Sequence, residues 1–214
     1  MPSIDALLNA LVTLFVTVDP VGNAPLFLGL TVGLAAAERR RIAVRGAAVA
    51  FAILALFALT GMAVLDAMGI TIDAFRVAGG LLLFFTAFEM IYGGRQERRE
   101  RTSDAAADEP VADVAVFPLA IPLLAGPGTI SATILLSTEL ASAPGVARWT
   151  GTAVLVGLIA AMMALTALVL VAAERLDVYL GRTAKLALTR LLGVLLAALS
   201  VQYVADGVRG LVAG

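Results

Sequence analysis

Two long stretches without a charged side chain, residues 46–65 and 149–173, constrain most strongly how this chain can fold. An α-helix needs about 20 apolar residues to cross about 30 Å of hydrocarbon, and each stretch is at least that long. The composition agrees, because 61% of the 214 residues are hydrophobic and only 14% are charged. An ordinary soluble domain has about 25% charged residues. The sequence therefore predicts an all-α, polytopic membrane protein.

Four further apolar segments bring the predicted number of spans to six. Residues 77–93 form span three and residues 186–205 form span six, while the two uninterrupted stretches form spans two and five. Spans one and four lie within residues 5–38 and 114–138, and both contain prolines and glycines. We divide the chain into a first repeat at 1–95, a charged loop at 96–113 and a second repeat at 114–214.

The interruptions in spans one and four are the most unusual local features. Span one contains Asp-Pro-Val-Gly-Asn-Ala-Pro at residues 19–25, and span four contains Pro118, Pro122 and Ala-Gly-Pro-Gly-Thr at residues 125–129. Proline removes a backbone donor and clashes with the preceding helical turn, and glycine weakens a helix. We expect both spans to be broken helices or re-entrant hairpins. The sequence leaves these two alternatives open, and simple kinks for packing are the plainer reading.

The distribution of Lys and Arg predicts the orientation. The connections between spans one and two, three and four, and five and six carry 12 of these residues, and the opposite side carries 3. Cytoplasmic loops are enriched in Lys and Arg. The odd-numbered loops are therefore predicted to be cytoplasmic, and both termini are predicted to lie outside.

The two halves of the chain show weak internal similarity. At an offset of 114, spans three and six pair Arg76 with Arg190, Gly79 with Gly193, Thr86 with Ser200 and Gly93 with Gly207. At an offset of 102, spans one and four pair Pro20 with Pro122 and Pro25 with Pro127. Each half has three spans, so the second half enters the membrane in the opposite sense. We predict two inverted three-span repeats, a plan common among secondary transporters.

The interruptions are candidate binding sites. Unpaired backbone groups are costly in hydrocarbon, and matching interruptions in two inverted halves point to a transport site. The N-terminus of a half-helix has free N–H groups and a positive dipole end, which favour an anion such as a carboxylate. The candidate substrate-binding residues are Asp19, Gly22, Asn23, Pro25, Gly126, Gly128, Thr129 and Ser131.

Different roles are predicted within this set. Asn23 is expected to cap the first half-helix with Pro25 in its first turn, and Thr129 or Ser131 to cap the second. The three glycines would let a solute approach the backbone. Asp19, an ionisable group inside span one, could hold an ammonium group, a cation or a proton. It could equally cap the turn through its own side chain, and both roles can coexist.

A second set of polar residues lies in spans three and six. These residues could couple ion movement or line a polar face, or they could form bonds between helices; they are Glu89, Thr86, Ser200 and Gln202. Glu89 could also extend to the membrane interface. The acidic residues near span ends are expected to be solvated; they are Asp66, Asp73, Asp206 and Glu139.

Several function classes are disfavoured by composition. The chain has no cysteine and no histidine, which removes thiol chemistry, the commonest general base and the commonest zinc ligand. We therefore expect no metal site, no cofactor and no enzymatic activity. The net charge of −1 gives no basic field that would attract nucleic acid.

The two interruption motifs resemble those of a known family. Residues 18–25 (VDPVGNAP) and 118–131 (PLAIPLLAGPGTIS) resemble the MarC family, also called UPF0056 membrane proteins, and the resemblance covers essentially the whole chain. The family is similar to the LysE-type exporter group. The resemblance implies a bacterial inner (plasma) membrane protein whose partners are membrane lipid and a small-molecule solute. It leaves oligomerisation open.

The resemblance implies a secondary transporter of a small neutral amino acid or a similar small solute, with proton coupling. Half-helix ends suit a carboxylate, Asp19 suits an ammonium group, and glycines leave room for a small molecule. The alternatives are an ion channel or cation-handling protein, and a membrane scaffold that transports nothing.

Overall fold

The described part of the chain is built from helices. The structure, a computed structural model, describes residues 2–93, 114–141, 147–173, 175 and 182–213. The predicted charged loop at 96–113 lies outside the described residues. The helical elements in chain order are α1 (Ile4–Val18), α2 (Pro20–Leu30), α3 (Ala36–Ala67), α4 (Ile72–Tyr92), η1 (Ala115–Leu124), α6 (Pro127–Ala141), α7 (Arg148–Val171) and α9 (Arg182–Ala213).

The lengths and compositions of these elements agree with a polytopic membrane protein. Within the described residues, five helical segments are long and apolar enough to cross a membrane, counting α1 and α2 together. The pair η1 and α6 passes the same test as a unit, although its two parts are bent by 59° at a short break. With this pair counted as one span, the number is six, which agrees with the predicted number.

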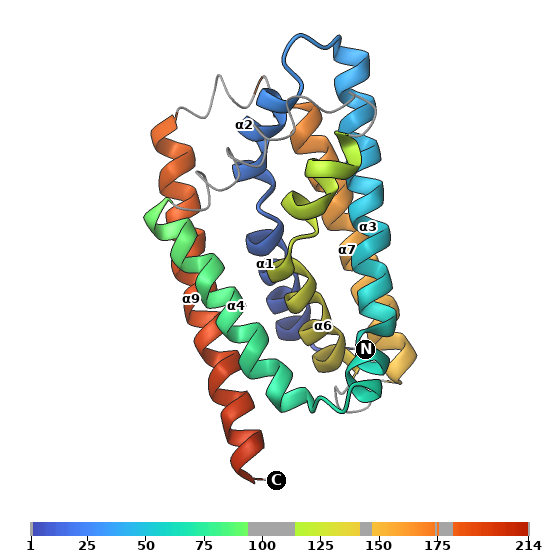
Figure 1. Cartoon of the computed structure of the whole chain (residues 1–214), viewed down its shortest axis with the longest axis vertical. Coiled ribbons are helices and arrows are strands. Elements are labelled where there is room, and N and C mark those ends of the chain that lie inside the picture. Colours follow the sequence, from blue (N-terminus) through green and yellow to red (C-terminus); the bar gives the residue numbers. More distant parts are fainter. Residues whose placement is uncertain (1, 94–113, 142–146, 174, 176–181, 214) are drawn as a thin grey trace.

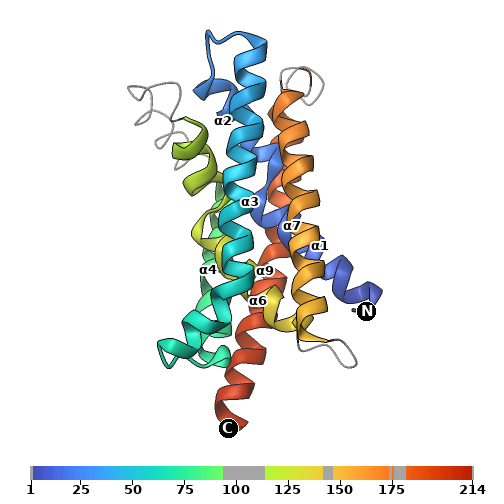
Figure 2. The same ribbon diagram turned by 90° about the vertical axis from the view of Figure 1, so that its right-hand side faces the viewer.

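The spans form one elongated bundle (Figure 1). Successive spans run in opposite directions, and α1 begins towards the end of the molecule at which α9 ends. The α2–α3 connection lies at the opposite end, as Figure 2 also shows. Helix α3 packs against α7, α4 packs against α9, and α1 contacts α6. The interruptions of spans one and four both lie in the middle part of the bundle.

Apolar side chains lie both inside and outside this bundle. One buried cluster joins α1, α3, α7 and η1, and a smaller one joins α4, α6 and α9 with Val16 of α1. The outer surface carries many large apolar side chains; examples are Leu56, Leu59, Phe85, Leu165, Leu168 and Leu195. So much exposed apolar surface is unusual for a soluble monomer and is expected where helices face lipid.

Glycines let α4 and α9 approach closely. A Cβ atom on Gly80 would lie 2.9 Å from the Ser200 carbonyl oxygen, and one on Gly193 would lie 3.2 Å from the Ala87 carbonyl oxygen. Small residues at such contacts let helix backbones pack tightly, which drives association in membranes where the hydrophobic effect between helices is weak. This packing holds the two helices of spans three and six together along much of their length.

Candidate functional site

The first interruption is centred on Asp19. Its backbone adopts the left-handed conformation with φ of 52°, and its side chain is 1% exposed. Its N–H donates to the Phe15 carbonyl oxygen at 2.9 Å, which ends α1, and its Oδ1 accepts from the Gly22 N–H at 3.0 Å, which caps α2. Aspartate tolerates the left-handed region better than most residues, and Pro20 is suited to the first position of a helix. One residue therefore ends α1 and begins α2.

The prediction that Asn23 caps the first half-helix is wrong. Asn23 lies inside the first turn of α2, where its N–H donates to the Asp19 carbonyl oxygen at 3.0 Å. Its side-chain Nδ2 donates to the Val18 carbonyl oxygen at 2.7 Å. Pro25 is the sixth residue of α2 and therefore lies beyond the first turn. The helix starts earlier than predicted because the Asp19 side chain caps it and Pro20 fits its first position.

The amide oxygen of Asn23 is unusual. Asn23 is 0% exposed, and its Oδ1 makes no hydrogen bond to any residue that the structure describes. Most buried polar side-chain atoms have a partner. A buried acceptor without one destabilises the protein by about 1–3 kcal/mol. The interruption therefore holds an acceptor that an additional donor would satisfy.

The second interruption lies between η1 and α6. Phe117 and Ile121 in η1 have extended backbone angles, so this segment is an irregular helix. Helix α6 begins at Pro127, and the Gly126 carbonyl oxygen accepts from the Ile130 N–H at 2.9 Å. Both half-helices thus begin with a proline, and these prolines, Pro20 and Pro127, are 107 positions apart. The predicted pairing at an offset of 102 does not match these helix starts.

The hydroxyl of Thr129 connects the two interruptions instead of capping α6. Thr129 Oγ1 donates to the Thr17 carbonyl oxygen at 3.3 Å, between residues 112 positions apart. Because α1 ends at Val18, the Thr17 carbonyl is one of the last carbonyls of that helix. The side chains of Asn23 and Thr129 therefore satisfy backbone carbonyls at the broken end of α1. Ser131, the other predicted cap, lies one turn into α6 and faces Gly79 of α4.

Protein groups lie close to the three glycines that were predicted to admit a solute, and their role in binding stays a prediction. A Cβ atom on Gly22 would collide with the Asp19 carboxylate, and one on Gly126 would lie 2.6 Å from the Pro122 carbonyl oxygen. A Cβ atom on Gly128 would lie 3.0 Å from Thr86 Oγ1. In this conformation the space at these glycines is filled by protein groups. Gly22 makes room for the Asp19 cap, and Gly128 brings Thr86 of α4 next to the second interruption.

A polar seam that the sequence analysis did not identify extends from the interruptions. On α1, Asn9, Thr13 and Thr17 repeat every four residues, and on α6, Thr129, Thr133 and Ser137 do the same. Five of these six side chains are buried, with Asn9 partly buried. A spacing of four places side chains on one side of a helix, so this spacing is the signal that could have revealed the seam. The two stripes run towards the end of the bundle where α1 begins and α6 ends (Figure 1).

The second set of predicted polar residues is dispersed. Ser200 is buried on α9, and its hydroxyl donates to the Ala197 carbonyl oxygen at 2.7 Å. Glu89 is partly buried on α4, one turn beyond Thr86. Gln202 is exposed and donates to the Asp206 carboxylate at 3.0 Å, and its place in a polar lining stays a prediction. Of this set, the structure brings only Thr86 to an interruption.

The expectation that Glu139 is simply solvated is also wrong. Glu139 is partly buried near the end of α6, beside the hydroxyl of Tyr203 on α9. Asp73 forms an ion pair with Arg76 at 3.0 Å. Among the described residues, no group of three or more acidic, histidine or cysteine side chains could hold a metal ion. The absence of a resident metal stays a prediction.

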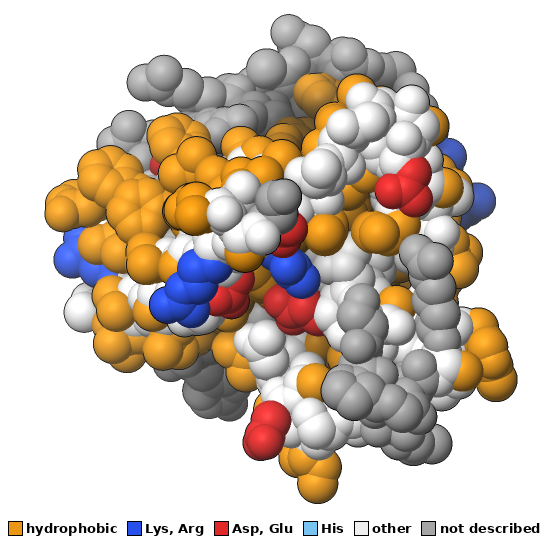
Figure 3. All heavy atoms as spheres, turned by 90° about the horizontal axis from the view of Figure 1, so that it is seen from below, with side chains coloured by type: hydrophobic (Ala, Val, Ile, Leu, Met, Phe, Trp, Pro, Cys, Tyr) orange, Lys and Arg blue, Asp and Glu red, His pale blue; other side chains and the backbone are white. Residues whose placement is uncertain are grey.

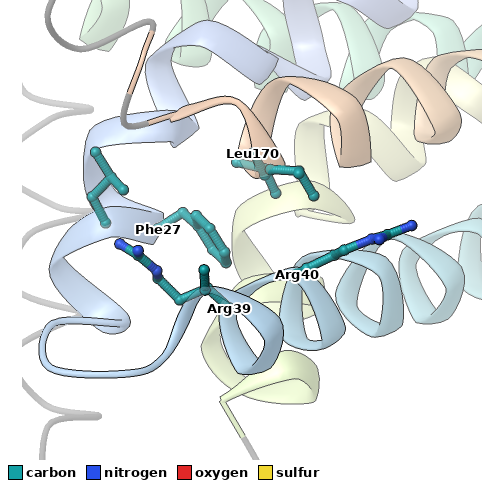
Figure 4. A pocket seen from close by; sticks show the side chains of 7 residues that line it. Phe27, Arg39, Arg40 and Leu170 are labelled. Atoms are coloured by element: carbon teal, nitrogen blue, oxygen red, sulfur yellow. The ribbon is translucent and has the colours of Figure 1, made fainter.

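One shallow cavity lies away from the interruptions. It has a volume of about 40 Å³ and is formed between α2, α3 and α7. Figure 4 shows Phe27 and Leu170 lining it, with the side chains of Arg39 and Arg40 around it. None of the predicted substrate-binding residues lines this cavity.

The apolar helices of the bundle and its exposed apolar surface define a polytopic α-helical integral membrane protein. The chain belongs to the MarC family of integral membrane proteins, whose family model matches residues 4–212. This confirms the predicted family. The predicted similarity to LysE-type exporters stays a prediction.

Relatives in bacteria and archaea support this assignment. The UPF0056 membrane protein YvbG of Bacillus subtilis is 36% identical over 96% of this chain and 95% of the relative. The UPF0056 membrane protein MJ1677 of Methanocaldococcus jannaschii is 37% identical over 92% of this chain and 93% of the relative. A UPF0056 membrane protein of Archaeoglobus fulgidus is 36% identical over 91% of this chain and 88% of the relative. No solved structure matches the chain.

Proposed function

We propose that this protein is a secondary transporter of a small neutral amino acid or a similarly small solute, coupled to proton movement, and that it is not an enzyme. The observation that carries the proposal is the Asn23 amide oxygen, which is buried at the contact between two interrupted spans and has no hydrogen-bond partner among the described residues. The ammonium group of an amino acid is a donor that would satisfy this oxygen.

The surroundings of Asn23 supply complementary chemistry for the rest of such a solute. Asp19 is buried beside it and carries a carboxylate that would attract the same ammonium group. The solute carboxylate would bind at the start of α6, because backbone N–H groups and the dipole at a helix N-terminus favour an anion. The start of α2 is less suitable, since the Asp19 carboxylate already accepts from the Gly22 N–H there.

We further propose that spans one and four are broken helices within two inverted repeats. In support, η1 and α6 continue in the same general direction across the bundle (Figure 1), unlike the two arms of a hairpin. The predicted equivalents α4 and α9 pack against each other. Gly80 contacts Ser200 and Val204, whereas Gly193 contacts Ala87 and Met90.

The arginines at the start of α3 support the proposed orientation. The start of α3, at the end opposite the start of α1, carries Arg39, Arg40, Arg41 and Arg45. This end would face the cytoplasm. The end of the bundle at which α9 terminates, towards which α1 begins, would then face outward.

The described conformation would be a closed one. Protein groups fill the space at Gly22, Gly126 and Gly128, and Thr129 holds the two interruptions together. Transport would require the broken ends to separate, so that Thr129 exchanges its bond to the Thr17 carbonyl for a solute or water. Gating of one repeat against the other around such a site is the usual mechanism in transporters with inverted repeats.

Exchange of labelled glycine, alanine or serine across proteoliposomes tests the proposal. We expect the wild-type protein to exchange at least one of them saturably, and Asn23→Ala to lose that exchange. Thr60→Ala is the matched control, because the Thr60 hydroxyl is exposed on α3 and donates to Leu56 within the same helix. The absence of saturable exchange of any small neutral amino acid by the wild-type protein would contradict the proposal.

Two other functions have specific support. A cation channel is favoured by the burial of Asp19 next to a broken helix, because intramembrane carboxylates often mark ion pathways. Ion conductance in planar bilayers without saturable solute exchange would favour it. A non-transporting scaffold is favoured by the close packing at the three glycines. The scaffold does not account for the buried Asn23 oxygen, which makes no hydrogen bond to a described residue.

A further inference from the structure

A second buried polar atom that has no hydrogen-bond partner within the described part of the chain lies far from Asn23 in the sequence. Tyr203 of α9 is 3% exposed, and its hydroxyl makes no hydrogen bond to any described residue. It lies beside the carboxylate of Glu139, near the end of α6, although the two groups do not form a hydrogen bond of ordinary geometry. A buried tyrosine hydroxyl usually has a partner.

The packing around Tyr203 fixes its position against α6. Its side chain belongs to the smaller buried cluster, together with Ala132 and Leu135 of α6 and Leu83 of α4. Glu139 follows Leu135 by four residues, which places it on the same side of α6. The Glu139 carboxylate therefore faces the region where α4, α6 and α9 meet.

The charges around Glu139 are partly neutralised by one another. Arg76 of α4 bonds to Asp73 at 3.0 Å. On α9, Asp206 accepts from Gln202 at 3.0 Å and from Arg209 at 3.5 Å. Among the described residues, Arg76 and Asp206 lie close enough to Glu139 for their charges to interact with its carboxylate.

Each of these arginines has its own carboxylate, and Glu139 is the additional acidic group of the cluster. Figure 3 views this end of the bundle and shows acidic and basic side chains close together among apolar ones. With the acids ionised, the cluster of Glu139, Asp73, Asp206, Arg76 and Arg209 has a net charge of −1.

A proton is the ligand that this arrangement suits. Adding a proton to the Glu139 carboxylate forms one O–H bond and brings the cluster to neutrality. The proton comes from a hydronium ion or a buffer acid in the outer solution, which loses it. A tyrosine hydroxyl can donate to an ionised carboxylate and can accept from a neutral carboxylic acid. Tyr203 can therefore pair with Glu139 in both states after a rotation of its hydroxyl hydrogen.

We propose that Glu139 and Tyr203 form a proton-binding site that α6 connects to the interruptions. The coupling of this site to transport rests on the proposed function, whereas its proton binding does not. Glu139 lies ten residues after Thr129 on the same helix, or about 15 Å at 1.5 Å per residue. A movement of α6 that separates Thr129 from Thr17 would also move Glu139 relative to Tyr203. Proton binding at one end of α6 would in this way be coupled to opening at the other.

Infrared difference spectroscopy of the protein in lipid membranes tests the proton site without requiring transport. On a pH change we expect the wild-type protein to show a carboxylic acid C=O band that is absent in Glu139→Gln and shifted in Tyr203→Phe. Glu38→Gln, at the exposed start of α3, is the matched control and should keep the band. A band that is the same in all four proteins would overturn the proposal. If Glu139→Gln does not fold, an unshifted band in Tyr203→Phe would overturn it.

Transport measurements then test the coupling. We expect Glu139→Gln to exchange solute at nearly the wild-type rate but to lose accumulation driven by a pH gradient, so that the inside-to-outside ratio falls to about one. Undiminished accumulation would overturn the coupling role. If the wild-type protein exchanges no solute, the proposed function fails, while the infrared result still decides whether Glu139 binds a proton.

Discussion

The substitution Thr129→Val isolates the contact between the two interruptions. The Thr129 hydroxyl donates to the Thr17 carbonyl oxygen at 3.3 Å, and both residues are nearly fully buried. Valine has nearly the same size and branching as threonine, but it cannot donate a hydrogen bond. The Thr17 carbonyl, which lies at the broken end of α1, would then lose this donor.

The expected loss of stability follows from that change. Losing one hydrogen bond between buried groups destabilises a protein by about 0.5–1.5 kcal/mol. For a chain of this size each kcal/mol lowers the unfolding midpoint by about 2–4 °C. We therefore expect Thr129→Val to lower the midpoint by about 1–6 °C in a thermal unfolding assay of the purified protein in detergent.

The control is Thr60→Val. The Thr60 hydroxyl donates at 2.8 Å to the Leu56 carbonyl oxygen within α3. That carbonyl lies inside a regular helix and keeps its backbone N–H partner, so we expect a change within about 0.5 kcal/mol. Equal midpoints for the two variants would refute the argument that Thr129 holds the interruptions together.

Two glycine substitutions test the close approaches in the same unfolding assay. Gly22→Ala places a methyl group against the Asp19 carboxylate and displaces the cap of α2, so we expect a loss of about 2–4 kcal/mol. Its control is Gly29→Ala, in the same helix with open space at its Cβ position, which should be neutral or stabilising by up to about 1 kcal/mol. Gly80→Ala should separate α4 from α9 and lower stability by about 1–3 kcal/mol, whereas Gly157→Ala, where a Cβ atom meets nothing within 4 Å, should not. A Gly80→Ala variant as stable as Gly157→Ala would contradict the packing argument.

Much of the architecture was predictable because it depends on local properties. The length of an apolar run determines whether a helix can cross the bilayer, so the all-helical fold and the number of spans followed from counting residues. Prolines and glycines act on their own turn of helix, so the positions of the interruptions near Pro20 and Pro127 were also predictable. The family followed from the motifs at these same positions.

The details of the site were less predictable because several residues there have similar propensities. Asp19 and Asn23 are both good N-caps, and only the backbone conformation shows that Asp19 is the cap. The role of Gly22 depends on where the Asp19 carboxylate lies. Gln202 was a reasonable candidate for a polar lining, yet the orientation of α9 places it on the surface beside Asp206.

The sequence alone therefore determined the membrane class, the spans and the places where two of them are interrupted, since these are set by residues close together in the chain. Only the tertiary structure decided which groups meet. It brings Thr129 to Thr17 across 112 positions and places Tyr203 of α9 beside Glu139 of α6. Such contacts depend on how helices rotate and pack against one another, and one residue's displacement along a helix turns its side chain by about 100°. A pattern of residue types along the chain does not record that rotation.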